Sequence, residues 1–129
     1  GWAAGLEFGR INPRAATQIV MEQFPGLGSQ MTPDVAVESQ MQLANVFAGR
    51  WEERKKWGFH LLESWKLFFD VGREIGQITG DFKLEDVVKN DYIDAANGFD
   101  AAKVKADADG FALSDAYKAV NVDEIAKRI

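Results

Sequence analysis

Apolar residues recur every three or four positions through most of the chain, and short capping or turn sequences separate these runs. This spacing predicts amphipathic helices. We expect the first helix over residues 2–11. The Asn-Pro pair at 12–13 supplies an N-cap and a proline at the first helical position, which predicts a second helix that stops at the Pro-Gly-Leu-Gly sequence at 25–28. The Thr-Pro pair at 32–33 predicts a third helix, which Gly49 ends.

The longest helix is expected from about His60 to Ile78, where apolar residues cover a wide face. A face this wide predicts contacts on two sides. Gly72 and Gly76 lie four positions apart on it and leave a flat strip that favours the approach of another backbone. Shorter helices are expected at residues 84–88, 92–96 and 100–113, and a tail helix is expected over residues 114–129.

No period-two run of β-branched residues lies between turns, so we assign no strand. The expected fold is all-α, with about six to seven short helices packed as an irregular bundle. A chain of 129 residues has room for one domain, and we expect a single helical domain over residues 1–129. Because the chain opens inside a helix without a cap, we interpret it as a piece of a longer protein; a frayed natural terminus is the alternative.

Charge and composition narrow the classes of partner. The net charge is −5, and the longest run of positive residues, 54–56, directly follows two glutamates, so we expect no nucleic-acid partner. No apolar run approaches the roughly 18 residues that a membrane span needs. The chain has no cysteine, which excludes disulfides, thiolate zinc sites and cysteine nucleophiles.

The residues that could carry chemistry do not form a recognisable site. His60 and Glu63 share a helix face, but a di-iron bundle needs two Glu-x-x-His pairs and further carboxylates. The Asp-x-Asp-Gly sequence at 107–110 lacks the glycine and glutamate positions of an EF-hand loop. No serine lies in a Gly-x-Ser-x-Gly elbow. We therefore expect no enzyme, no metal and no cofactor.

Trp51 and Trp57 are the only candidates for ligand contact. They flank a charged stretch in an expected loop or short turn. Aromatic residues on loops often contact ligands. Packing against a neighbouring part of the protein is the alternative role for both.

The order of several motifs resembles one protein family, the ABC-transporter solute-binding proteins of the nitrate, sulfonate, taurine and thiamine-precursor class. The similarity covers residues 2–113. It rests on Asn-Pro-Arg-Ala-Ala at 12–16 followed by Pro25, Trp-Gly at 57–58, Asn-Asp-Tyr-Ile-Asp-Ala-Ala-Asn at 90–97, and Phe-Asp at 99–100 with Lys-Val-Lys-Ala-Asp-Ala at 103–108.

The resemblance implies a parent protein with two α/β lobes joined by a hinge, in which lobe closure traps the ligand. This chain is similar only to its C-terminal helical section, so the strands and most cleft residues would lie upstream. The implied partners are the N-terminal remainder of the parent, an ABC permease and a small-molecule ligand, the last two through the parent. The implied location is periplasmic or extracytoplasmic. The tail after Leu113 has no clear counterpart in the family.

Two other functions stay open. The broad apolar face at residues 60–78 also suits a stand-alone helical protein–protein interaction module, or a homodimer through exposed apolar surface. An enzyme would need a pocket of converging polar groups, which the sequence does not indicate.

Overall fold

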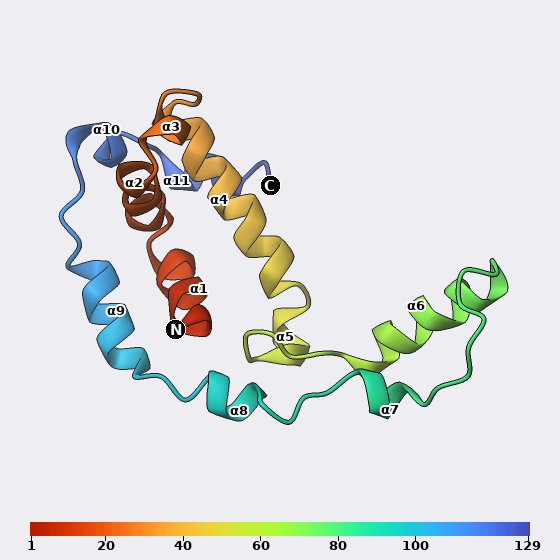
Figure 1. Ribbon diagram of the computed structural model, residues 1–129. Coiled ribbons are helices and arrows are strands. Elements are labelled where there is room, and N and C mark those ends of the chain that lie inside the picture. Colours follow the sequence, from red (N-terminus) through yellow and green to blue (C-terminus); the bar gives the residue numbers. More distant parts are fainter. The chain divides into compact units, whose positions relative to one another are not determined.

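The chain is all-helical, as expected. The computed structural model describes all residues from 1 to 129, with 65% of them in helices and no strand. The number of helices is higher than the expected six to seven, because many turns of four or five residues form between the breaks in the pattern. The longer helices are α1 (Trp2–Ile11), α2 (Pro13–Gln23), α4 (Pro33–Ala48), α6 (Leu62–Glu74) and α9 (Ala101–Asp109) (Figure 1). The short ones are α3 (Pro25–Gly28), α5 (Trp51–Arg54), α7 (Leu84–Val87), α8 (Ile93–Ala96), α10 (Asp115–Lys118) and α11 (Val122–Ala126).

The helices fall into two compact units. The first unit comprises residues 1–49 and 99–129, and the second comprises residues 50–98. The second unit is therefore one continuous insertion between two parts of the first. The single domain over residues 1–129 stays a prediction. No helix has both the length and the apolar character that crossing a membrane requires.

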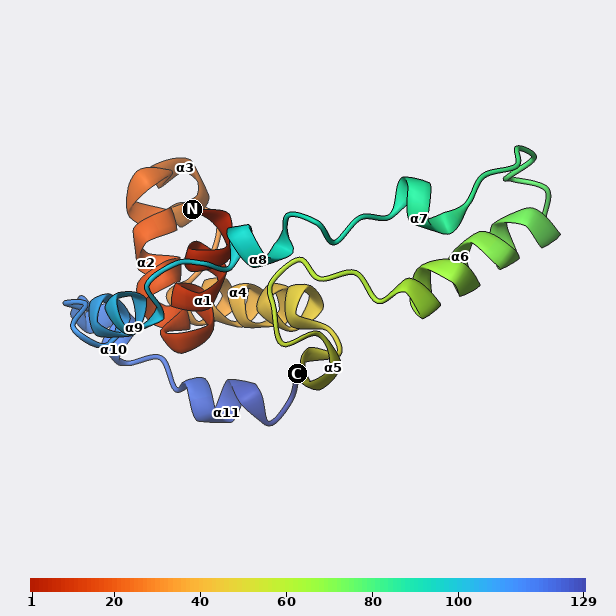
Figure 2. The same cartoon turned by 90° about the horizontal axis from the view of Figure 1, so that it is seen from below.

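Asn12 ties the two halves of the first unit together. Its Oδ1 accepts a hydrogen bond from the Ala15 backbone N–H at 3.0 Å, which caps α2 as the sequence predicts. Its Nδ2 donates to the carbonyl oxygen of Ala108, on α9, at 2.8 Å. The helices α1 and α9 lie side by side (Figures 1 and 2), and the rings of Phe8 and Phe111 meet edge to face at 6.4 Å. Asn12 thus caps the start of α2 and also joins it to α9, at a residue 96 positions away.

The tail supplies much of the core of the first unit. Val37 of α4 is fully buried, and Val120 and Ile125 of the tail pack against it. Arg128 forms an ion pair with Glu38 at 2.5 Å across the same contact. The expected single tail helix is divided into α10 and α11, since the Asn121 side chain caps a new helix by accepting hydrogen bonds from the Asp123 and Glu124 N–H groups.

The main helix of the second unit, α6, is shorter at both ends than expected. At its C-terminus the Gly72 carbonyl oxygen accepts hydrogen bonds from the N–H groups of Gln77 and Ile78, and Gly76 adopts a positive φ of 74°. The chain turns back here, and Ile78 lies so close that a Cβ on Gly72 would be 2.7 Å from its Cδ1. The close approach expected at Gly72 is therefore made by the Ile78 side chain and not by another backbone, and Gly76 lies outside the helix.

Candidate functional site

Trp51 and Trp57 face each other in the second unit. Trp51 begins α5, and the chain then turns at Lys55, which takes the left-handed conformation with φ of 53°. The two indole ring centroids lie 4.7 Å apart, with the planes tilted by 49°. Trp57 is only 3% exposed, whereas Trp51 is half-buried. Of the two, Trp51 keeps more surface for a ligand, and ligand contact by either residue stays a prediction.

Residues 57–60, a turn followed by irregular backbone, are held by two asparagine side chains. Asn97 Oδ1 accepts from the Trp57 backbone N–H at 2.9 Å, and Asn97 Nδ2 donates to the Trp57 carbonyl oxygen at 3.0 Å. Asn90 Oδ1 accepts from the His60 N–H at 2.9 Å, and Asn90 Nδ2 donates to the His60 carbonyl oxygen at 2.9 Å. Each amide thus pairs with a backbone residue as a peptide group does in a β-ladder. We call these four hydrogen bonds the asparagine clamp.

The clamp also positions α8, because Asn90 and Asn97 lie on either side of it. Asn97 Nδ2 makes a further hydrogen bond to the Ile93 carbonyl oxygen at 2.8 Å, within the same turn. Without these contacts, a helix of four residues would have little stability of its own. The sequence contains both asparagines in the stretch that carries the family resemblance, but nothing in their spacing identifies their backbone partners 30 and 40 residues away.

His60 takes part in an aromatic contact next to the clamp. Its Nδ1 accepts a hydrogen bond from Trp65 Nε1 at 3.1 Å, and the two rings lie 5.6 Å apart. Glu63, its expected neighbour on a shared face, forms an ion pair with Arg50 instead. No group of three or more His, Asp or Glu side chains is gathered so that it could hold a metal ion.

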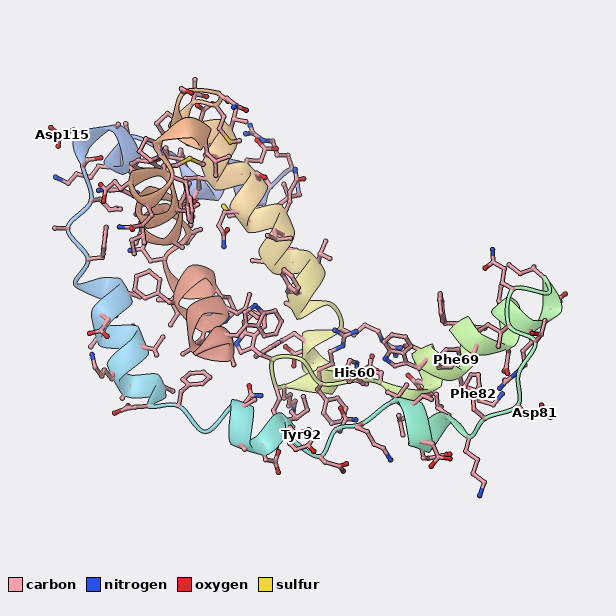
Figure 3. All side chains as sticks on the ribbon, viewed as in Figure 1. His60, Phe69, Asp81, Phe82, Tyr92 and Asp115 are labelled. Carbon is pink, nitrogen blue, oxygen red and sulfur yellow. The ribbon has the colours of Figure 1, made fainter.

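An aromatic cluster covers one side of α6. Trp65, Phe68 and Phe69 contact one another, and the Phe69 and Phe82 rings meet edge to face at 5.0 Å (Figure 3). The Arg73 guanidinium lies 4.8 Å from the Phe82 ring centroid, a cation–π distance. A shallow hollow of about 240 Å³ lies beside this cluster, and its charged residues have both signs: Lys66, Asp70, Arg73, Lys83 and Glu85. Such a mixed lining does not select an anion or a cation.

Next to this cluster, and sharing Phe68 with it, α6 carries apolar side chains that its own unit leaves uncovered. Leu67, Phe68, Val71 and Ile75 follow helical spacing and are between 45% and 66% exposed. We call these four residues the α6 stripe. An exposed, continuous apolar stripe marks a surface that other protein covers, or one that associates with copies of itself.

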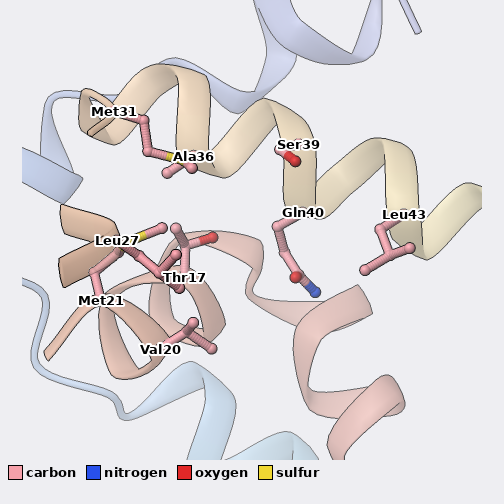
Figure 4. Close-up of a pocket in the computed structure, with 9 residues that line it drawn as sticks. All are labelled: Thr17, Val20, Met21, Leu27, Met31, Ala36, Ser39, Gln40 and Leu43. Carbon is pink, nitrogen blue, oxygen red and sulfur yellow. The ribbon is translucent and has the colours of Figure 1, made fainter. Parts of the chain in front are cut away.

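The first unit has an apolar groove between α2, α3 and α4 (Figure 4). Its volume is about 190 Å³, and its lining is Thr17, Val20, Met21, Leu27, Met31, Ala36, Ser39, Gln40 and Leu43. The Thr17 hydroxyl is already bonded to the Pro13 carbonyl oxygen at 2.7 Å. No charged group lines the groove, and Ser39 and Gln40 are its other polar side chains.

A second exposed apolar region of the first unit lies where α1 and α4 meet. The Trp2 and Phe47 rings contact each other edge to face at 5.4 Å, yet Trp2 is 62% exposed. Leu43 and Val46 of α4 are exposed as well. Each unit thus presents large apolar side chains that it does not bury.

The chain matches no model of a known protein family, no curated protein and no solved structure. Its functional assignment therefore depends on the motifs in the sequence and on what those residues do in the fold.

Proposed function

We propose that this chain is the C-terminal helical section of an extracytoplasmic solute-binding protein that delivers a small molecule to an ABC importer. The parent protein belongs, in this proposal, to the nitrate, sulfonate, taurine and thiamine-precursor class. The chain itself supplies framework and does no chemistry: the parent binds its ligand, closes its lobes and presents the ligand to a permease.

The observation that carries the proposal is the pairing of the motifs. Asn12 of the first motif is hydrogen-bonded to Ala108 of the last, and Trp57 of the second is bonded to Asn97 of the third. Residues picked out as similar to one family are thus the ones that join distant parts of this chain. Chains with the same fold need the same junctions, so these contacts support a shared architecture.

Exposed apolar surface supports the same proposal. The α6 stripe on the second unit and the region around Trp2 and Phe47 on the first are too apolar to face water over a large area. In the proposal, the N-terminal remainder of the parent covers these surfaces. Trp51, whose ring contacts Trp57 of the clamped segment, is the residue of this chain that we expect nearest to a ligand.

The decisive experiment identifies the natural polypeptide. An antibody raised against this chain, followed by mass spectrometry of the captured protein from exported and cytoplasmic fractions, gives its length and N-terminal sequence. We expect an exported polypeptide much longer than 129 residues that contains this sequence. A cytoplasmic product of 129 residues contradicts the proposal.

The second candidate is a stand-alone helical interaction module, which the α6 stripe favours. This function predicts that the native product is the short chain and that it binds a partner through Leu67, Phe68, Val71 and Ile75. Replacing Phe68 by serine should then abolish partner capture. In the receptor proposal, the same substitution in the parent should lower stability, because the stripe is internal there.

A further inference from the structure

The residue after the clamp asparagine Asn97 is Gly98. In a flexible chain an Asn-Gly pair loses its amide spontaneously. The backbone nitrogen of the glycine attacks Cγ of the asparagine and forms a five-membered succinimide, while the side-chain nitrogen leaves as ammonia and takes the proton of the glycine N–H. Water then opens the ring to aspartate or isoaspartate. Glycine favours this reaction because it has no side chain to obstruct the attack.

The fold hinders the attack of the Gly98 nitrogen on Asn97 Cγ in three ways. The Asn97 amide is held by three hydrogen bonds, to both backbone groups of Trp57 and to the Ile93 carbonyl oxygen. The Gly98 N–H donates to the Ala95 carbonyl oxygen at 3.3 Å. With ψ of 2° at Asn97, the Gly98 nitrogen is turned away from the Asn97 side chain. Attack therefore requires the clamp to open and the backbone to rotate.

We propose that Asn97 is a deamidation site whose rate the asparagine clamp controls. The reaction is suppressed while the Asn97 amide is hydrogen-bonded to Trp57, and it proceeds only when these hydrogen bonds break in a local opening. This inference concerns the chain whatever its parent does, so it goes beyond the proposed function and does not depend on it. The hydrogen bonds that protect the Asn97-Gly98 pair are made by Asn97 itself, to Trp57 and Ile93.

Deamidation permanently removes the hydrogen bonds that Asn97 Nδ2 donates, one of which belongs to the clamp. A carboxylate has no N–H, so the hydrogen bonds to the carbonyl oxygens of Trp57 and Ile93 cannot re-form. Two carbonyl oxygens would then face a negatively charged group, which adds repulsion to the lost bonds. A molecule that has opened long enough to react is thereby left with a loosened segment beside Trp57, and the change accumulates with age.

The test compares folded and urea-unfolded protein in the same mildly alkaline buffer. Trypsin cleaves after Lys89 and Lys103, so both clamp asparagines fall in one peptide, 90–103, in which tandem mass spectrometry distinguishes them. We expect conversion at Asn97 to be about tenfold or more faster in the unfolded chain, since the native rate follows the population of the open state. Asn90, which precedes Asp91, is the internal reference.

Gly98→Ala is the matched control. An alanine Cβ at this position would lie 3.4 Å from the Ala95 carbonyl oxygen, an ordinary contact, so the fold accepts it. This variant should lose most of the conversion at Asn97 in the unfolded chain. Equal rates of conversion in folded and unfolded wild-type protein contradict control of the rate by the clamp. If Asn97 stays intact in the unfolded wild-type chain, it is not a deamidation site.

A second variant opens the clamp without touching Asn97. Gly58 has a φ of 78°, a conformation that an alanine resists, so Gly58→Ala should loosen residues 57–60. We expect severalfold faster conversion at Asn97 under native conditions. Gly80→Ala, in open space without a positive φ, should leave the rate unchanged. A Gly58→Ala protein with the wild-type rate contradicts the role of the clamp.

Discussion

Asn90 and Asn97 stabilise the irregular backbone of residues 57–60, because one amide side chain offers a donor and an acceptor in a single plane. Removing one amide leaves the backbone N–H and C=O of its partner without hydrogen bonds in a half-buried place. Asn90→Ala should therefore lower the free energy of unfolding of the second unit by about 1–3 kcal/mol.

The measurement is hydrogen exchange at the His60 backbone N–H, which donates to Asn90 Oδ1 in the wild-type protein. We expect this amide to lose protection in Asn90→Ala. Asn45→Ala, on the exposed face of α4, is the control and should change neither stability nor exchange. Unaltered protection at His60 would show that the clamp contributes nothing.

The pKa of the Tyr117 hydroxyl depends on how the tail packs. Burial against the core of the first unit raises the pKa of its hydroxyl, and the nearby charge of Glu22 raises it further. The folded state thus binds this proton more tightly than the unfolded state. The resulting stability is fully present below the unfolded pKa of about 10 and is lost as the pH rises through the higher folded pKa.

Phenolate absorbance during an alkaline titration measures this shift. In a Tyr92→Phe background only Tyr117 contributes, and the fold does not need the lost hydroxyl because Tyr92 is 79% exposed. We expect a midpoint above about 10, which moves down when the chain is unfolded. A midpoint that is the same in both states would mean that Tyr117 is solvated.

At the scale of elements, α11 contributes more than its five residues suggest. Ile125 is 3% exposed and belongs to the buried cluster with Val37 and Val120. Ile125→Ala should lower the free energy of unfolding by about 2–4 kcal/mol through lost burial and a cavity. Ile129→Ala, at a position 39% exposed, should cost far less. Urea denaturation of both variants measures the difference, and equal costs would contradict a core role for α11.

The sequence predicts those elements whose signals are local. The starts of α2 and α4 follow from an Asn-Pro and a Thr-Pro pair, and the start of α9 follows from Asp100, whose side chain accepts from the Lys103 N–H. The predicted end of α6 at Ile78 was wrong, because Ile78 continues the apolar pattern yet folds back over Gly72. Periodicity does not distinguish these two placements.

The contacts that sequence patterns miss are those between distant residues. Val120 and Ile125 lie in the expected tail helix, but nothing in the sequence shows that they pack against Val37 of α4. The clamp likewise depends on a pairing between residues 57–60 and the two asparagines, which no local spacing specifies. Ligand contact by Trp51 and Trp57 stays a prediction from the sequence, and the structure adds that their rings contact each other.

At the scale of the whole molecule, the apolar surface of the isolated chain has consequences for its behaviour in solution. The α6 stripe presents an aromatic and three aliphatic side chains in one row, and water contact with such a row is unfavourable. We expect the 129-residue chain to self-associate in sedimentation velocity as its concentration rises. Replacing Leu67 and Phe68 by serine should restore a monomer, because it removes the two most exposed large side chains of α6.

In the proposed longer parent protein, the same substitutions distinguish two causes of this association: a stripe left uncovered in the short chain, and an interface between copies. If its N-terminal remainder covers the stripe, the parent should be monomeric, and the same two serines should lower its thermal stability. If the parent dimerises and the serine substitutions dissolve that dimer without loss of stability, the stripe is an interface between copies. Lys105→Ser, whose side chain is exposed on α9, is the control for placing a serine at an exposed helical position and should affect neither property. Association of the short chain would then follow from an uncovered surface and would not by itself be a function.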